Sequence, residues 1–192
     1  MFLFFLGMAI FLSMHSLGIL AKAWRDRQVT RLGAVGWKGI YSLISAIGFI
    51  LMIVGFGQAR DASYRLYAPP GWLHYLTILL TLAAFILIAA AYVPRNHLKQ
   101  WLGHPMLAGV IAWAFGHLAS IGMLRDVILF SSFLIWAIID FVVSRRHDQI
   151  VGTIYPAGTL RGDLLSLVIG TTSWTVVAFW LHKLVIGLNP LG

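Results

Sequence analysis

Six apolar stretches, each long enough for a membrane-spanning helix, alternate with short polar connections along the chain. They lie at residues 2–21, 38–56, 72–93, 105–123, 127–143 and 164–186. An α-helix needs roughly 17–25 mostly apolar residues to cross the hydrocarbon core of a bilayer. The pattern therefore predicts an all-α, polytopic transmembrane bundle of about six spans, forming a single domain over residues 1–192.

The composition supports a membrane protein and excludes an ordinary soluble domain. Hydrophobic residues make up 60% of the chain and charged residues only 10%, and the mean hydropathy is +0.88. The first stretch has no basic leading region and no small-residue cleavage site, so we interpret it as a retained helix and not as a signal peptide. We expect a multi-pass membrane protein, with the lipid bilayer as its surroundings.

The basic residues predict the orientation in the membrane. Cytoplasmic connections are enriched in lysine and arginine, and only an outside N-terminus places most of these residues inside. Both termini are therefore predicted to lie outside. The net charge of +8 follows from this topology, so we expect no nucleic-acid partner. The inner set holds ten of the 14 basic residues: Lys22, Arg25, Arg27, Arg31, Lys38, Arg95, Lys99, Arg145, Arg146 and Arg161.

Two histidines lie inside predicted spans. His117 follows Pro105 by twelve residues, which is about 18 Å along a helix axis. An ionisable side chain at such a depth is costly and is a functional candidate by default. The structural alternative is a hydrogen bond to a neighbouring helix, and the functional alternatives are a haem or metal ligand and a proton relay. His15, in the first span, is the best candidate partner, and their depths match best if that helix extends to Trp24 rather than stopping at Leu20.

Small residues mark two helix faces. Gly48 and Gly55 lie seven residues apart, which predicts close packing of the second helix against another. In the fourth span small residues step by four, and they allow either a flat group or another helix to approach. The members of this second stripe are Ala108, Ala112, Gly116 and Ser120.

The other titratable residues are expected near the membrane surfaces. His104, at the start of the fourth span, could bind a haem propionate, orient a loop or be interfacial. Asp140 is expected to pair with the arginines that follow it, Arg145 and Arg146, and the alternative is a proton site. His74, His97 and His147 are expected to be solvated and His182 interfacial, and the propionate candidates on the inner side are Arg25, Arg31 and Lys38.

The chain resembles the NnrU family over nearly its whole length. The most specific element is HPMLAGVIAWAFGHL at residues 104–118, where Trp113 and His117 follow His-Pro-Met at fixed spacing. His15-Ser16, RLG at residues 31–33 and KGIY at residues 38–41 add to it. NnrU proteins are linked by genetic context to denitrification, in nitrite and nitric oxide reduction. The zeta-carotene isomerase of plants and cyanobacteria looks like a relative of this family.

The resemblance implies haem b as the cofactor. The isomerase is a membrane haem protein with two axial histidines and a cysteine that can replace one of them. Its ligands correspond to His15 and His117 here, with His104 and Trp113 as further cofactor-binding residues. Its cysteine corresponds to Ala114, and a chain without any cysteine cannot exchange a thiolate onto iron. The chain also lacks the family's usual arginine before His-Pro and its common Asn-Gly turn after the second histidine; here the residues are LG at 102–103 and ASIG at 119–122.

Three hypotheses follow. The first is a six-helix protein of the bacterial inner (cytoplasmic) membrane that binds one b-type haem between His15 and His117. Its role would be related to redox or nitrogen-oxide metabolism, with a lipid or gas as a possible ligand at the iron. The second is a haem-dependent cis–trans isomerase of a polyene or carotenoid-like lipid. The third is a cofactor-free membrane assembly factor or partner protein, in which both histidines only pack. Catalytic residues and oligomeric state do not follow from the sequence.

Overall fold

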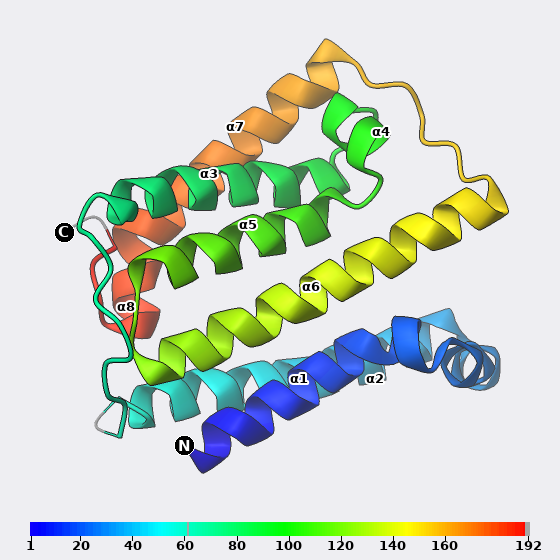
Figure 1. Cartoon of the computed structure of the whole chain (residues 1–192). Coiled ribbons are helices and arrows are strands. Elements are labelled where there is room, and N and C mark those ends of the chain that lie inside the picture. Colours follow the sequence, from blue (N-terminus) through cyan, green and yellow to red (C-terminus); the bar gives the residue numbers. More distant parts are fainter. Residues whose placement is uncertain (61, 191–192) are drawn as a thin grey trace. The chain divides into compact units, whose positions relative to one another are not determined.

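The N-terminal unit, Met1–Tyr64, consists of two antiparallel helices (Figure 1). The structure is a computed structural model that describes residues 1–60 and 62–190. Helix α1 covers Phe2–Leu20 and α2 covers Lys22–Gln58. Both are apolar and long enough to cross a membrane.

Glycines bring α1 and α2 into backbone contact. A Cβ atom added at Gly55 would collide with the backbone of Phe4, and one added at Gly48 would lie only 2.9 Å from the nitrogen of Phe11. On α1, a Cβ added at Gly7 would likewise collide with the backbone of α2. The predicted close-packing face of the second helix is therefore confirmed, since any larger side chain there would separate the two helices.

Residues 22–37 are helical, although the charge pattern predicted a polar connection. The helix breaks only at Gly33, whose φ of 73° and ψ of 161° are non-helical. Before that break, Lys22 donates to Asp26 one turn later at 2.8 Å. The segment contains no proline, and alanine, lysine, arginine and glutamine are good helix formers. A basic helical segment therefore precedes the second membrane span.

The second unit begins at Arg65, and α3 lies at its centre. Helix α3 contacts α5 and α7, and α5 also contacts α6 (Figure 1). Helix α3 runs antiparallel to both α5 and α7. Its packing against α5 is close: a Cβ added at Gly109 would lie 2.8 Å from the carbonyl oxygen of Ala84, and one added at Gly116 would lie 3.2 Å from Leu80. The elements are α3 Leu73–Tyr92, α4 His97–Leu102, α5 Pro105–Ser120, α6 Leu124–Val151, α7 Leu160–Val176, the π-helix η1 Val177–Leu181 and α8 His182–Ile186.

The α3–α5 contact shows, for part of the small-residue stripe, whether a flat group or another helix approaches there. The side chain of Thr77 on α3 donates to the carbonyl oxygen of Gly116 at 2.6 Å. Gly116 and Gly109, seven residues apart, are both buried on the side of α5 that meets α3. At Gly116, therefore, the small residue serves helix packing.

Among the described residues, five helices are long and apolar enough to cross a membrane, and α5 is a shorter apolar helix of 16 residues. About six spans are thus consistent with the structure, as predicted. Many large apolar side chains face outward, including Leu79 (64% exposed) and Ile135 (59%), as lipid-facing side chains do. The single domain predicted for residues 1–192 and the orientation in the membrane stay predictions.

Helix α5 ends at Ser120, three residues before the predicted end. The next residues are extended because they pair with the connection that precedes α3: the Leu66 amide donates to the Gly122 carbonyl oxygen at 2.7 Å. A Cβ at Gly122 would collide with the carbonyl oxygen of Tyr67. The Tyr67 hydroxyl in turn donates to the carbonyl oxygens of Leu118 and Ile121, which caps the C-terminal end of α5.

Candidate functional site

His117 lies in the last turn of α5, inside an aromatic environment. Its Nδ1 is 2.8 Å from the carbonyl oxygen of Trp113, one turn earlier. The imidazole stacks on Phe130 of α6, with ring centroids 4.3 Å apart and an interplanar angle of 18°. The Trp113 ring lies 5.3 Å from the imidazole and also contacts Phe133 edge-on. Two helices of the same unit therefore fix the orientation of this ring.

His15 shows the same local arrangement in the N-terminal unit. Its Nδ1 is 2.8 Å from the carbonyl oxygen of Phe11, again one turn earlier. The imidazole stacks on the Phe11 ring at 4.1 Å and lies 5.4 Å from Tyr41 of α2. Each unit thus presents one histidine that is oriented by an aromatic residue four positions before it and by an aromatic ring from the next helix.

This arrangement fixes the tautomer of both imidazoles. A carbonyl oxygen only accepts hydrogen bonds, so Nδ1 carries the proton and Nε2 of the neutral ring carries the lone pair. Histidines that ligate metals usually have this feature, because the second ring nitrogen donates to a carbonyl or carboxylate and so orients the first. The repeated signal is an aromatic residue followed by histidine at the fourth position, FLSMH at residues 11–15 and WAFGH at residues 113–117.

A buried hydroxyl lies near the level of His15. The side chain of Ser45 on α2 is only 8% exposed, and its Oγ has no hydrogen-bond partner among the described residues. Gly48, three residues later, packs against Phe11, so the antiparallel register places Ser45 close to the level of His15. An unsatisfied hydroxyl inside an apolar helix pair is costly, and it leaves a polar atom available to a bound group.

The donor set suits a haem iron better than a protein-bound metal ion. Within residues 1–60 and 62–190 there is no group of three or more histidine or acidic side chains that could hold a metal ion. A haem iron already has four porphyrin nitrogens and takes only one or two protein ligands. His15 and His117, each with a lone pair on Nε2, therefore have the donor atoms that a haem iron takes. Their joint ligation of one iron stays a prediction. The depths of the two histidines were expected to match best if the first helix extended to Trp24, but α1 ends at Leu20.

His104 belongs to a separate polar cluster at the start of α5. Its Nε2 lies 2.9 Å from a carboxylate oxygen of Asp148 near the end of α6, and the Tyr155 hydroxyl donates to the same oxygen at 2.7 Å. Burial, and then the bond to Asp148, raise the pKa of Tyr155 to about 12. These contacts fasten the α6–α7 connection to α5. Of the three alternatives for His104, the structure therefore favours the one in which it orients a loop.

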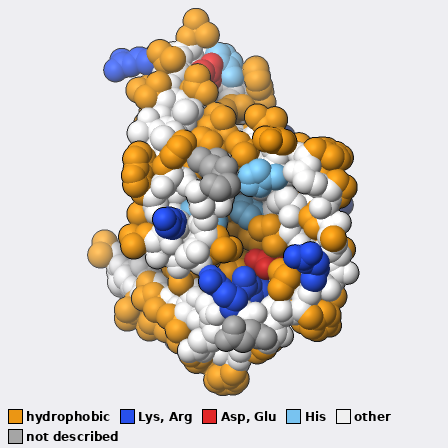
Figure 2. All heavy atoms as spheres, turned by 90° about the vertical axis from the view of Figure 1, so that its left-hand side faces the viewer, with side chains coloured by type: hydrophobic (Ala, Val, Ile, Leu, Met, Phe, Trp, Pro, Cys, Tyr) orange, Lys and Arg blue, Asp and Glu red, His pale blue; other side chains and the backbone are white. Residues whose placement is uncertain are grey.

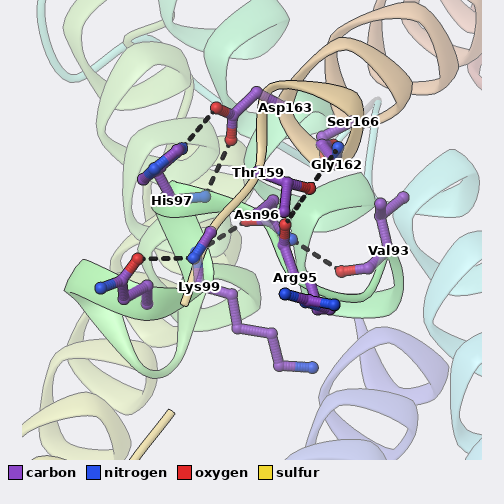
Figure 3. Close-up of polar contacts among 11 residues, drawn as sticks. Val93, Arg95, Asn96, His97, Lys99, Thr159, Gly162, Asp163 and Ser166 are labelled. Atoms are coloured by element: carbon purple, nitrogen blue, oxygen red, sulfur yellow. Dashed lines mark hydrogen bonds and ion pairs between the residues drawn. The ribbon is translucent and has the colours of Figure 1, made fainter. Parts of the chain in front are cut away.

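His97 also anchors a connection, although it was expected to be solvated. Its backbone amide and its Nδ1 bind the two carboxylate oxygens of Asp163 at 2.8 and 2.6 Å (Figure 3). Beside this pair the Asn96 side chain caps α4 by accepting from the Lys99 amide, and it donates to the Val93 carbonyl oxygen. The network joins the start of α4, just after α3, to the beginning of α7, and His97 and Asp163 are 66 residues apart in the chain.

The remaining polar candidates are placed as follows. Asp140 accepts a hydrogen bond from Ser144 at 2.9 Å, whereas Arg145, one of its expected partners, lies 3.9 Å from Asp148. Arg25, one of the propionate candidates, is paired with Asp26 at 3.2 Å. The Nδ1 of His182 lies 2.9 Å from the carbonyl oxygen of Leu188.

Replacing Gly103 with alanine is expected to destabilise the second unit more than replacing Gly152 does. Both glycines have positive φ angles, 72° and 68°, at which a side chain costs about 1–2 kcal/mol. Only at Gly103 is the space occupied: a Cβ would lie 2.7 Å from Nη1 of Arg145 and 3.0 Å from the Tyr155 ring. Thermal unfolding of both variants in detergent measures the difference, and equal losses would contradict the crowding argument.

The fold and these histidines define a class: a polytopic helical membrane protein with two helix-borne imidazoles, each of which faces a backbone carbonyl oxygen with its Nδ1 atom. The chain belongs to the NnrU family, since the model of that family, described as NnrU protein, matches residues 3–190. No curated protein and no solved structure matches the chain.

Proposed function

We propose that this NnrU-family protein binds a b-type haem in the membrane, with His117 as one axial ligand and His15 as the other. The observation that carries the proposal is the Nδ1–carbonyl hydrogen bond that both imidazoles make at 2.8 Å. It leaves the Nε2 lone pair of each ring for iron. The unsatisfied hydroxyl of Ser45 near the level of His15 supports it further.

The chain's own residues would orient the ligands and hold a dry environment. Trp113 and Phe130 fix the His117 ring, and Phe11 and Tyr41 fix the His15 ring. Bound haem would supply a one-electron centre and a binding site for a small gas. This chemistry suits the redox or nitrogen-oxide role that the family suggests, in the bacterial inner membrane.

The isomerase alternative has less support in this chain. The position that corresponds to the relative's exchangeable cysteine is Ala114, which is fully buried and has no ligating atom. A haem-dependent isomerisation here would have to proceed without thiolate exchange. The cofactor-free alternative explains the Nδ1 bonds as simple satisfaction of buried polar groups, and only a measurement separates it from haem binding.

Absorption spectra of the detergent-purified protein, produced with ample haem, test the proposal. We expect a Soret band and a sharp α-band of b type after reduction, and we expect His117→Ala to abolish or strongly reduce haem binding. His15→Ala should change the spectrum, because one axial ligand is replaced or lost. His147→Ala is the matched control, since its side chain is exposed on α6, and it should leave the spectrum unchanged. Wild-type protein that binds no haem would refute the proposal and favour the cofactor-free alternative.

A further inference from the structure

The basic segment that begins α2, residues 22–32, turns away from the helix pair of the N-terminal unit. Gly33 ends the segment with its non-helical backbone, and the apolar part of α2 follows. Figure 1 shows the segment as a short blue helix seen nearly end-on, whereas α1 and the rest of α2 run across the picture. Both of these helices are long and apolar enough to cross a membrane, so a segment that lies across their direction runs along the membrane surface.

Two tryptophans fix this segment at the start of the membrane span. The indole rings of Trp24 and Trp37 meet edge to face, with centroids 5.8 Å apart and an interplanar angle of 77°. Trp37 follows the break at Gly33 and is buried, whereas Trp24 is 44% exposed. Tryptophan is enriched at the boundary between hydrocarbon and headgroups, so the exposed indole indicates that the segment lies at that level.

Arg27 and Arg31 share one face of the segment with Trp24. They follow the tryptophan by three and seven residues, a spacing that places all three side chains on the same side of a helix. Both arginines are exposed. In the described part of the chain, neither guanidinium group has an ion-pair or hydrogen-bond partner. Two guanidinium groups one turn apart are therefore available to an anion outside the protein.

The acid of this segment, Asp26, does not neutralise these two arginines. It lies on a different face of the helix, where it binds Lys22 at 2.8 Å and Arg25 at 3.2 Å. The side chain of Thr30 on that face donates to the backbone carbonyl oxygen of Asp26 at 3.0 Å. The segment thus pairs its charges on one face and leaves them unpaired on the face that contains the exposed indole.

This concentration of charge stands out against the rest of the surface. Figure 2 shows one face of the molecule, on which hydrophobic side chains are far more abundant than charged ones. An anionic phospholipid matches both parts of the face formed by Trp24, Arg27 and Arg31: its phosphate fits the two guanidinium groups, and the adjoining acyl chains fit the indole. A free phosphate ion would match only the charges.

We propose that residues 22–32 form an interfacial helix that binds an anionic phospholipid, with Arg27 and Arg31 on its phosphate and Trp24 beside its acyl chains. The predicted topology places this segment on the cytoplasmic side, where the membrane surface is negatively charged. The inference concerns the N-terminal unit alone and does not rest on haem binding.

Native mass spectrometry of the full chain in detergent, titrated with phosphatidylglycerol or phosphatidylcholine, tests the proposal. Wild-type protein should bind phosphatidylglycerol more tightly than phosphatidylcholine. Arg27→Gln/Arg31→Gln should weaken phosphatidylglycerol binding about ten- to thirtyfold, since each basic side chain at a membrane surface contributes roughly a factor of five. Arg146→Gln/Arg161→Gln is the matched control, because it removes two exposed arginines that lie on different helices of the same predicted side, and it should leave the titration nearly unchanged.

Gly33→Ala tests whether the orientation of the segment is required. The φ of 73° and ψ of 161° at Gly33 disfavour an L side chain, so alanine should let the segment continue the helix of the membrane span and move both arginines away from the headgroups. Gly39→Ala is the control: a Cβ has open space at both positions, but of the two only Gly33 has a positive φ. We expect weaker phosphatidylglycerol binding in Gly33→Ala alone, although its charge equals that of the wild type.

Three results would overturn the proposal. One is equal affinity of the wild type and Arg27→Gln/Arg31→Gln for phosphatidylglycerol. Another is an equal loss in this variant and its arginine control, because net charge alone would then explain the binding. The third is displacement of the lipid by an equal concentration of inorganic phosphate, which would make the two arginines a phosphate-ion site. Circular dichroism should show unchanged helix content in the arginine variant, and Gly33→Ala decides separately because it keeps both arginines.

Discussion

Replacing Gly55 with leucine is expected to separate the two helices of the N-terminal unit. A Cβ at this position already collides with the backbone nitrogen of Phe4, and a backbone cannot move aside as a flexible side chain can. Extra methylene groups in a packed interior typically cost about 1–3 kcal/mol, and we expect the upper end of that range or more here. Hydrogen exchange followed by mass spectrometry on the full chain should show faster exchange throughout α1.

The control for this change is Gly57→Leu. Gly57 lies in the same turn of α2, but a Cβ there has open space around it. Both variants add the same apolar side chain and remove the same glycine, so hydrophobicity and helix propensity cancel in the comparison. Equal exchange rates in the α1 peptides of both variants would mean that this glycine face does not hold the helices together.

The membrane-spanning helices could be predicted from the sequence because the chain folds in a lipid bilayer. A helix in lipid must be apolar along its whole length and satisfies its own backbone, so hydropathy alone locates it. The ends were less predictable, because charge does not stop a helix. Helix α6 continues eight residues past the predicted end at Val143 and terminates at Gly152, whose left-handed conformation is a common helix stop.

The candidate ligands were found from sequence, and most of their surroundings were not. His15 and His117 stand out because ionisable residues are rare inside apolar stretches. The partners of His104 and His97 could not be inferred, since Asp148 and Asp163 lie 44 and 66 residues away and only the folded chain brings them close.

Replacing Asp126 with asparagine is expected to cost up to about 3–5 kcal/mol, because it removes a carboxylate beside the buried side chain of Arg125. Arg125 and Asp126 lie in the first turn of α6 and are only 6% and 5% exposed. Nε of Arg125 lies 3.5 Å from the Asp126 carboxylate. Asparagine keeps the size of the side chain, so thermal unfolding in detergent reports mainly the lost charge.

Tyr67 offers a local readout of the same change. Burial, and then the negative charge of Asp126, raise the pKa of its hydroxyl above the ordinary value. Asp126→Asn removes the charge but not the burial, so the pKa of Tyr67 should fall, and this tyrosine should ionise at lower pH in an alkaline absorbance titration. Tyr67→Phe identifies the step by removing it.

The double variant Arg125→Leu/Asp126→Leu separates the value of the ion pair from the cost of breaking it. Desolvation opposes the attraction between two buried charges, so removing both should cost clearly less than the sum of the two single changes. A fully additive result would show that the two side chains act independently, each through other neighbours. Strong non-additivity would mean that the pair at the start of α6 matters chiefly because neither buried charge is tolerated alone. Two apolar residues at these positions could then keep the helix in place.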